Sequence, residues 1–289
     1  MEDFGVANNA PFEGDTLADI SSFQVSVNVM SAIFEDKIKV NSVYLNEPKI
    51  HVIVNQEGKA NWDIAITSEE KEEEEKPEDE SVSLISIGEW KITDGDVIYD
   101  DATMPLMATI KKLNHTGSGE IAQVYDLMTT TSIQSLSVNF DSTQYLNENT
   151  LYIDMTLNLD LNNSKYTFKE NTIKLNDFSF GFDGFFAMPD SLTNDMDITF
   201  KAKETAFKNI LSLVPGVFLE GFEELKTSGD LAFDGFAKGK MVGDQLPTFS
   251  LNLLVNEGMF QYPDLPTAVK NVNIDLAICL LYTSPSPRD

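Results

Sequence analysis

Apolar and polar residues alternate without a break along residues 151–160, and this pattern constrains the fold more than any other feature of the chain. A two-residue period sends successive side chains to opposite faces of a β-strand. The chain turns at residues 161–164 and returns with a second apolar series, whose phase slips at Asn176 and Asp177. Such a slip predicts a β-bulge. The apolar residues of the two arms are Leu151, Ile153, Met155, Leu157, Leu159, Tyr166, Phe168, Ile173, Leu175, Phe178, Phe180 and Phe182.

The same alternation recurs along most of the chain and predicts a mainly β protein. Two dipeptides, Asp94 with Gly95 and Glu257 with Gly258, interrupt alternating series and predict hairpin turns. They lie in similar stretches, residues 92–99 and 255–262, which form a weak internal repeat. We expect about fifteen strands, which at ~4.8 Å per strand make a long twisted antiparallel sheet, roughly 70 Å along its axis.

One stretch departs from the two-residue period. Its apolar residues follow the i, i+3, i+4, i+7 spacing of an amphipathic helix, and Pro215 ends the pattern. These residues are Phe207, Ile210, Leu211 and Val214. We therefore expect one or two short helices, confined mainly to residues 204–225. Residues 121–140 partly fit a helical face, but the three consecutive threonines at 129–131 favour strands.

The chain carries 47 acidic and 20 basic side chains, which gives a net charge of −27. Nucleic-acid binding and docking on an anionic bilayer both require clustered Lys and Arg, so the composition argues against both. Residues 69–80 contain nine acidic residues and two lysines. Because such a run repels itself and buries nothing, we expect residues 68–80 to form a disordered, mobile loop. A calcium loop is the alternative, but the spaced Asp, Asn and Gly residues of such a loop are absent.

Residues that carry catalysis or bind metals are scarce. Cys279 is the one cysteine, so a disulfide within the chain is excluded, and His51 and His115 are the two histidines. His51 lies on the polar side of its alternating series, which favours an exposed polar residue over a metal ligand. The sequence contains no nucleophile elbow, phosphate loop or His–acid pair. We expect no enzyme activity, no catalytic residue, no metal site and no cofactor.

The sequence predicts four segments. Residues 1–67 form an N-terminal β segment, residues 68–80 the acidic loop, and residues 81–278 the larger β region. Residues 279–289 ignore the alternation before them and resemble a translated sequencing-library adaptor, which would make them a non-native tail; an ordinary flexible Pro/Ser tail is the alternative. No secretory signal and no apolar run of roughly 20 residues occurs. We interpret the chain as an internal fragment of a longer protein.

Five stretches together resemble the AsmA family of bacterial envelope proteins, which is similar to the TamB-like and YhdP-like proteins. They are residues 43–50 (VYLNEPKI), 55–63 (NQEGKANWD), 90–99 (WKITDGDVIY), 211–215 (LSLVP) and 256–266 (NEGMFQYPDLP). The order and spacing of these stretches carry the resemblance, which spans nearly the whole chain up to Ile278. It implies that the sheet curves into an open groove with a hydrophobic interior. It also implies a periplasmic body, an inner-membrane anchor that this chain lacks, and a family without catalytic motifs.

Two functions follow from the apolar face together with this resemblance. In the first, a groove shields and conducts phospholipid acyl chains between membranes and supports outer-membrane lipid homeostasis. In the second, the face packs shut and the protein is a non-transporting structural or assembly factor for outer-membrane proteins. A 16-carbon chain exposed to water loses on the order of 12 kcal/mol, so conduction requires a continuous apolar track. We expect phospholipid acyl chains, the membrane and other envelope proteins as partners. The candidate lining residues are Leu151, Ile153, Met155, Leu157, Leu159, Phe178, Phe180, Phe182, Leu251 and Leu253.

Overall fold

The fold is that of a computed structural model of the full 289-residue chain. The structure describes residues 1–34, 39–63, 86–119, 124–190, 192–206, 209, 225–242, 246–262 and 266–280. The expected acidic loop at residues 68–80 lies outside these ranges, as do residues 281–289 of the expected tail.

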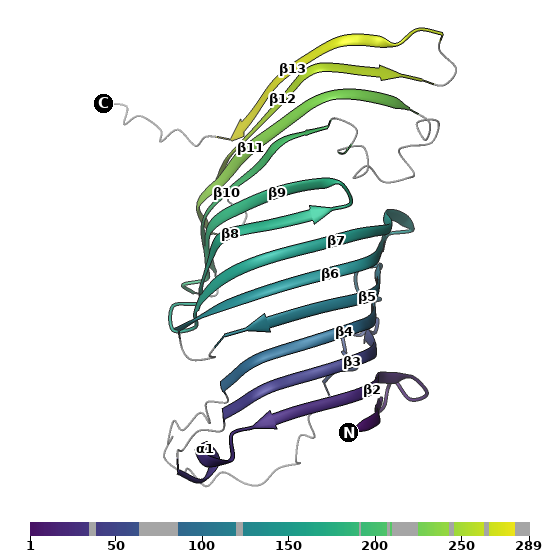
Figure 1. Ribbon diagram of the computed structural model, residues 1–289, viewed down its shortest axis with the longest axis vertical. Coiled ribbons are helices and arrows are strands. Elements are labelled where there is room, and N and C mark those ends of the chain that lie inside the picture. The colour runs from purple at the N-terminus through teal and green to yellow at the C-terminus, as the bar shows by residue number, and fades with distance from the viewer. Residues whose placement is uncertain are drawn as a thin grey trace. The chain divides into compact units, whose positions relative to one another are not determined.

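Thirteen β-strands form one sheet, and each strand pairs with its neighbours in the sequence, from β1 to β13 (Figure 1). The strands are β1 (Glu2–Ala7), β2 (Thr16–Val27), β3 (Lys39–Val54), β4 (Ser86–Asp101), β5 (Leu106–Ser118), β6 (Val124–Phe140), β7 (Thr143–Asp160), β8 (Lys165–Leu175), β9 (Phe178–Ala187), β10 (Thr193–Ala206), β11 (Lys226–Val242), β12 (Thr248–Gln261) and β13 (Val269–Leu280). The prediction of a mainly β protein is confirmed. Figure 1 also shows that β11, β12 and β13 bend along their length.

The chain divides into two compact units. Unit 1 comprises Met1–Ala122 with Thr131–Glu148, and unit 2 comprises Gln123–Thr130 with Asn149–Asp289. Long strands β6 and β7 each contribute residues to both units, so the division does not follow the segments expected from the sequence. In unit 1, buried apolar residues include Ile20, Val54 and Ile133. The buried cluster of unit 2 is described with the candidate site.

One pairing corrects the expectation of a purely antiparallel sheet. Strands β3 and β4 are parallel, with Val43 opposite Trp90 and Ile50 opposite Val97. Parallel neighbours need a crossover connection of a dozen or more residues. Residues 55–85 provide it here, and they include the acidic run. A tight turn therefore could not replace the whole connection between β3 and β4.

The two expected hairpin turns at Asp-Gly and Glu-Gly are instead β-bulges within continuous strands. Asp94 lies in β4 with a φ of 52°, and Glu257 lies in β12 with a φ of 49°. The register shifts around the following glycines, where Gly95 pairs with Leu113 and Gly258 with Val272. An acidic residue in the left-handed conformation followed by glycine suits a turn and a bulge equally well, and here the chain does not reverse.

The weak internal repeat is a structural repeat that also includes the following strand. The backbone N–H of Asp94 donates to Asn114 Oδ1 at 3.2 Å, and that of Glu257 donates to Asn273 Oδ1 at 3.1 Å. Asn114 Nδ2 also donates to the Lys112 carbonyl, and Asn273 Nδ2 donates to the Asn271 carbonyl. Lys112 and Asn271 both have a positive φ. In each copy, both strands of the pair therefore bulge. The side-chain amide of the asparagine accepts the backbone N–H of the acidic residue, which the bulge leaves without a partner in the ladder.

The bulge expected at Asn176 and Asp177 is wrong: these two residues form the turn between β8 and β9, with Leu175 opposite Phe178. Asn176 has a φ of 51°, as such two-residue turns require. The bulge lies a few residues earlier, where Glu170 has a φ of 53° and where Glu170 and Asn171 together lie opposite Met155 of β7. Asn171 is buried, accepts a hydrogen bond from Thr156 N at 2.8 Å and donates to the Phe182 carbonyl at 3.4 Å.

Helix occurs at a place that the alternation did not predict. Helix α1 (Val29–Phe34) follows β2, and Asn28 caps it by accepting hydrogen bonds from Met30 N and Ser31 N. The helix expected near 204–225 is strand at 204–206, and nearly all of the remainder lies outside the described residues. The strand interpretation of the ambiguous residues 121–140 is confirmed by β6 for residues 124–140.

Candidate functional site

In unit 2, cross-strand pairing aligns apolar residues on one face of the sheet from β7 to β13. Residues directly opposite each other in neighbouring strands share a face, so the register traces rows that run across the strands. One row is Ile153, Ile173 and Phe180 on β7 to β9, which packs against the continuing row Ala202, Phe233, Leu253 and Leu276 on β10 to β13. A second row is Leu157, Phe168, Gly184, Ile198, Ala237, Phe249 and Leu280.

Three further rows complete this surface, which we call the apolar face. The third row, on β7 to β11, is Leu159, Tyr166, Phe186, Met196 and Gly239. The fourth row, on β8 to β13, is Asn171, Phe182, Phe200, Gly235, Leu251 and Ile278. The fifth row is Leu151, Leu175 and Phe178 on β7 to β9, continued by Leu231, Val255 and Ile274 on β11 to β13. None of these row members carries a charge. Asn171 is the one amide among them, and its polar atoms are bound by the bulge that it occupies.

Part of the apolar face is a closed core. Ala202, Leu231 and Val255 are each 1% exposed, and Phe178 is 4% exposed. The Phe233 ring lies within the same cluster, with centroid distances of 5.6 Å to Phe178 and 5.8 Å to Phe200. Aromatic rings at these separations contribute packing energy beyond their buried area. This cluster fixes the register of β9 to β12.

Glycine opposite phenylalanine lets the backbone and ring approach closely on this face. Gly235 pairs with Phe200, and a Cβ atom at Gly235 would lie 2.5 Å from the Phe200 ring. The ring therefore lies over the bare backbone of β11. A larger side chain at residue 235 would displace it, because real Cβ contacts are not that short.

The apolar face is more exposed on β13 than on β12. On β13, Ile274 is 38% exposed, Leu276 42% and Ile278 46%. Their row partners on β12, in contrast, include Val255 at 1%. Contiguous apolar surface that stays in contact with solvent marks a binding surface more often than scattered single residues do.

All ten candidate lining residues lie on the apolar face. Register places nine of them in the rows above, and Met155 joins them because it alternates with Ile153 and Leu157 on β7. The sequence did not single out Phe200 and Phe233, although both lie in expected strands. Their position in the aromatic cluster depends on pairing across β9, β10 and β11, which single-strand alternation does not reveal.

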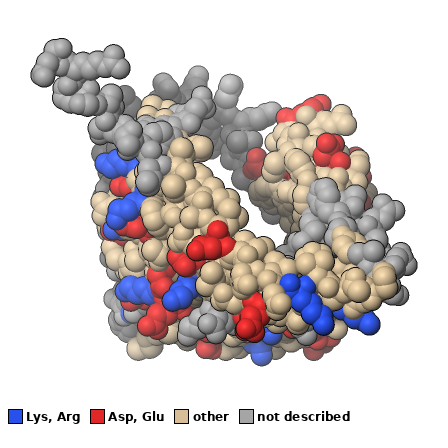
Figure 2. Space-filling view, turned by 90° about the horizontal axis from the view of Figure 1, so that it is seen from above, with Lys and Arg blue, Asp and Glu red and all other residues tan. Residues whose placement is uncertain are grey.

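Charged side chains of unit 2 occupy the opposite face, which we call the polar face. The register aligns Lys201 with Asp234, and Asp197 with Lys238. Lys238 Nζ lies 2.5 Å from Asp197 Oδ2. Figure 2 shows basic and acidic side chains along the left and lower edges and further acidic side chains at the upper right, with uncharged surface between them. The division into two faces explains how an acidic chain keeps one face uncharged.

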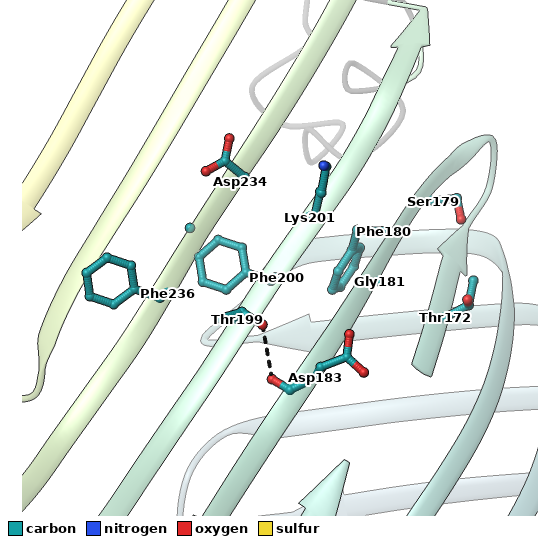
Figure 3. A pocket seen from close by; sticks show the side chains of 11 residues that line it. Thr172, Ser179, Phe180, Gly181, Asp183, Thr199, Phe200, Lys201, Asp234 and Phe236 are labelled. Atoms are coloured by element: carbon teal, nitrogen blue, oxygen red, sulfur yellow. Dashed lines mark hydrogen bonds between the residues drawn. The ribbon is translucent and has the colours of Figure 1, made fainter. Parts of the chain in front are cut away.

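A shallow hollow of about 880 Å³ lies on the polar face above Gly181 (Figure 3). Most of the residues that line it belong to this face, including Asp183, Lys201 and Asp234. The carboxylates already have partners: Asp183 accepts a hydrogen bond from Glu170 N, and Asp234 accepts one from Asn252 Nδ2 at 3.0 Å. The hollow therefore belongs mainly to the polar face, although Phe180, Phe200 and Gly235 of the apolar rows also line it.

The chemistry of metal binding and proton transfer has little support in the described part of the chain. Among the described residues, no group of three or more His, Cys, Asp or Glu side chains could hold a metal ion. His115 Nε2 accepts a hydrogen bond from Trp90 Nε1 at 2.9 Å, and His115 Nδ1 lies 2.8 Å from Thr131 Oγ1. Burial lowers the pKa of this imidazole. Within the ranges that the structure describes, no helix is long and apolar enough to span a membrane.

Comparisons with protein-family models, with curated proteins and with solved structures find no match for this chain. The resemblance to the AsmA family therefore stays a prediction from the five sequence stretches.

Proposed function

We propose that the apolar face of unit 2 shields phospholipid acyl chains from water and lets them slide across the strands. The single observation that carries this proposal is one row whose uncharged members pair strand by strand from β7 to β13: Leu157, Phe168, Gly184, Ile198, Ala237, Phe249 and Leu280. Sliding requires every intermediate position to be apolar, because each CH₂ group returned to water costs about 0.8 kcal/mol.

The dimensions of the face support an acyl chain as cargo. Seven strands at ~4.8 Å spacing span roughly 29 Å across the sheet. One leaflet of a bilayer is half of the ~30 Å hydrocarbon core, and it accommodates one acyl chain. A single acyl chain lying along a row therefore fits between β7 and β13 with room to move.

The exposure of apolar residues on β13 supports contact between this strand and an acyl chain. Ile274, Leu276 and Ile278 are the most exposed members of their rows. An acyl chain can reach them from outside without displacing packed side chains. The proposal extends, through the resemblance, to phospholipid movement between membranes in a bacterial envelope, with a periplasmic body anchored in the inner membrane.

The alternative function is a structural or assembly factor for outer-membrane proteins. The observation that favours it is the closed cluster around Leu231 and Val255, where the apolar face is a core and admits no acyl chain. The two functions differ in whether the more exposed part of the face holds lipid.

The deciding experiment compares two substitutions on adjacent residues of β13. Leu276 lies on the apolar face and Ala277 on the polar face, and both are exposed. The wild-type chain, Leu276→Asp and Ala277→Asp are purified from bacteria, and retained lipid is extracted and quantified by mass spectrometry. We expect phospholipid with the wild type and with Ala277→Asp, and a several-fold loss with Leu276→Asp.

Thermal melting of the same samples separates lipid loss from unfolding. The carboxylate at residue 276 remains in contact with water, so Leu276→Asp should melt close to the wild type. A wild-type chain that retains no lipid would contradict the proposal and favour the structural alternative. Equal retention by both variants would show that the apolar face is not the lipid-binding surface.

A further inference from the structure

Two loops of unit 1 border a cleft of about 550 Å³ that lies outside the apolar face of unit 2. One wall consists of residues 9–12, in the connection between β1 and β2, and the other of residues 58–63, in the turn after β3. Trp62 and Phe12 supply aromatic surface, while Asn9, Lys59 and Asp63 supply polar groups. Small-molecule sites combine these features: an apolar lining with a few polar groups that orient the ligand.

The side chain of Trp62 is 48% exposed although the turn that carries it is rigid. Asn55 Oδ1 accepts hydrogen bonds from Glu57 N at 3.0 Å and from Lys59 N at 2.9 Å. Asn61 is 3% exposed, accepts a hydrogen bond from Ile53 N at 2.9 Å and donates to the His51 carbonyl at 2.7 Å. These hydrogen bonds hold the backbone of the turn that presents the exposed indole ring.

The opposite wall is ordered by its own backbone hydrogen bonds. Phe12 N donates to the Asn9 carbonyl at 2.9 Å, and Asn8 N donates to the Asp15 carbonyl at 3.2 Å. These bonds hold the backbone of residues 8–15 in a compact turn, so this wall of the cleft is shaped without a ligand.

Charge around the cleft disfavours an anionic ligand. Lys59 Nζ lies 3.1 Å from Glu57 Oε2, and Asp63 adds one further carboxylate. An anionic ligand would meet these carboxylates, and an acyl chain would cover amide and charged groups without satisfying them. A sugar ring satisfies both kinds of surface, because its C–H face packs on an indole ring and its hydroxyl groups donate to and accept from amides and carboxylates.

We propose that the cleft between residues 9–12 and 58–63 binds a neutral carbohydrate, with the sugar ring on Trp62. Asn9 and Asp63 bind hydroxyl groups at the rim. This site is separate from the acyl-chain function of unit 2 and does not depend on it.

Intrinsic fluorescence tests the proposal directly, because Trp62 is exposed and the other tryptophan, Trp90, is half-buried. The full chain is titrated with chitotriose and, separately, with maltotriose. A sugar that covers the indole should shift its emission to shorter wavelength with a saturable dose response. Trp62→Ala should abolish this response, and Asp63→Asn should weaken the affinity by about tenfold, the effect typical of one important contact.

Tyr152→Ala provides the matched control, since Tyr152 is an exposed aromatic residue of unit 2 and lies far from the cleft in sequence. It should respond like the wild type. Saturation-transfer NMR with Trp62→Phe gives a second readout that does not need tryptophan emission: the ring is kept, so sugar binding should persist in weaker form. If neither sugar gives a saturable signal, or if Trp62→Ala binds as well as the wild type, the proposal is wrong. Binding of a polyproline peptide in place of the sugars would also overturn it and would identify the cleft as a peptide site.

Discussion

A single imidazole in unit 1 illustrates how a hydrogen-bond network can fix a protonation state. Trp90 Nε1–H can only donate, so His115 Nε2 must accept and the proton lies on Nδ1, which donates to Thr131 Oγ1. The two rings also stack, with centroids 6.3 Å apart. A second proton on His115 would turn Nε2 into a donor, and the Trp90 Nε1–H would lose its acceptor.

This network predicts a loss of stability in mild acid. Burial lowers the folded-state pKa of His115 below the ordinary value of about 6.5. As the pH falls below ~6.5, the unfolded chain takes up the proton first, so the free energy of unfolding decreases; above ~6.5 the full contribution is present. Urea unfolding of the wild type and His115→Gln between about pH 5.5 and 8 measures the difference, which should shrink as the pH falls. A wild-type slope in His115→Gln would refute the assignment.

At the scale of elements, the double bulge recurs in β4–β5 of unit 1 and β12–β13 of unit 2. The two copies share a left-handed acidic residue, a following glycine and an asparagine on the next strand whose amide binds both bulges. Their glycines also have similar surroundings, since a Cβ atom at Gly95 or Gly258 would lie 3.1 Å from the side chain three residues earlier. The shared geometry indicates that one local sequence solution was used twice.

This repeat predicts opposite effects for two substitutions in unit 2. Asn273→Ala removes the acceptor of Glu257 N and should lower the free energy of unfolding by about 1 kcal/mol. Glu257→Gly keeps that hydrogen bond and removes the left-handed strain of a residue with a Cβ, so it should stabilise by up to ~1 kcal/mol. Urea denaturation of both variants tests the pair. Asn114→Ala in the first copy should match Asn273→Ala, and a markedly different cost would show that the copies are not energetically equivalent.

The apolar face makes a further prediction on β7. Leu157 is half-buried and pairs with Phe168, so an aspartate at residue 157 should keep access to water and allow folding. Leu157→Asp should therefore melt near the wild type but retain less lipid. Leu231→Asp, at a residue that is 1% exposed, should lose several kcal/mol and unfold. Tyr152→Asp on the polar face is the control. If Leu157→Asp unfolds, the face around residue 157 is a closed core. If Leu157→Asp folds and retains all of its lipid, this part of the apolar face does not bind lipid.

Local alternation predicted the strands and the membership of the apolar face, because a period of two depends only on residues near in sequence. It could not distinguish a bulge from a turn at Asp94 and Glu257. The same dipeptide suits both, and the outcome depends on which other segment of the chain pairs with it. The same limit applies to the parallel pairing of β3 with β4, which a crossover of residues 55–85 makes possible. Nothing local indicated α1, whose capping residue Asn28 directly follows an alternating strand.

At the scale of the whole molecule, charge is the dominant property. The net charge is −27, while the ion pairs found among the described residues are Lys59–Glu57, Lys112–Asp94 and Lys238–Asp197. All three are at least partly exposed, and exposed pairs contribute about 0–1 kcal/mol each. We therefore expect long-range repulsion among the carboxylates to outweigh the local attraction that these pairs provide.

Salt should consequently stabilise this protein. The Debye length falls from about 30 Å at 0.01 M to about 10 Å at 0.1 M, which screens distant repulsion more than it weakens contacts within a few ångströms. Thermal melting in increasing NaCl over this range should show a rise of several degrees, and KF at equal ionic strength should give the same rise if screening is the cause. Deleting residues 69–80, which carry a net charge of −7, leaves −20 and should reduce the salt response while changing the stability little. A melting temperature that falls as salt is added would mean that local ion pairs outweigh the repulsion, and a loss of several kcal/mol on deletion would mean that the acidic run is structural.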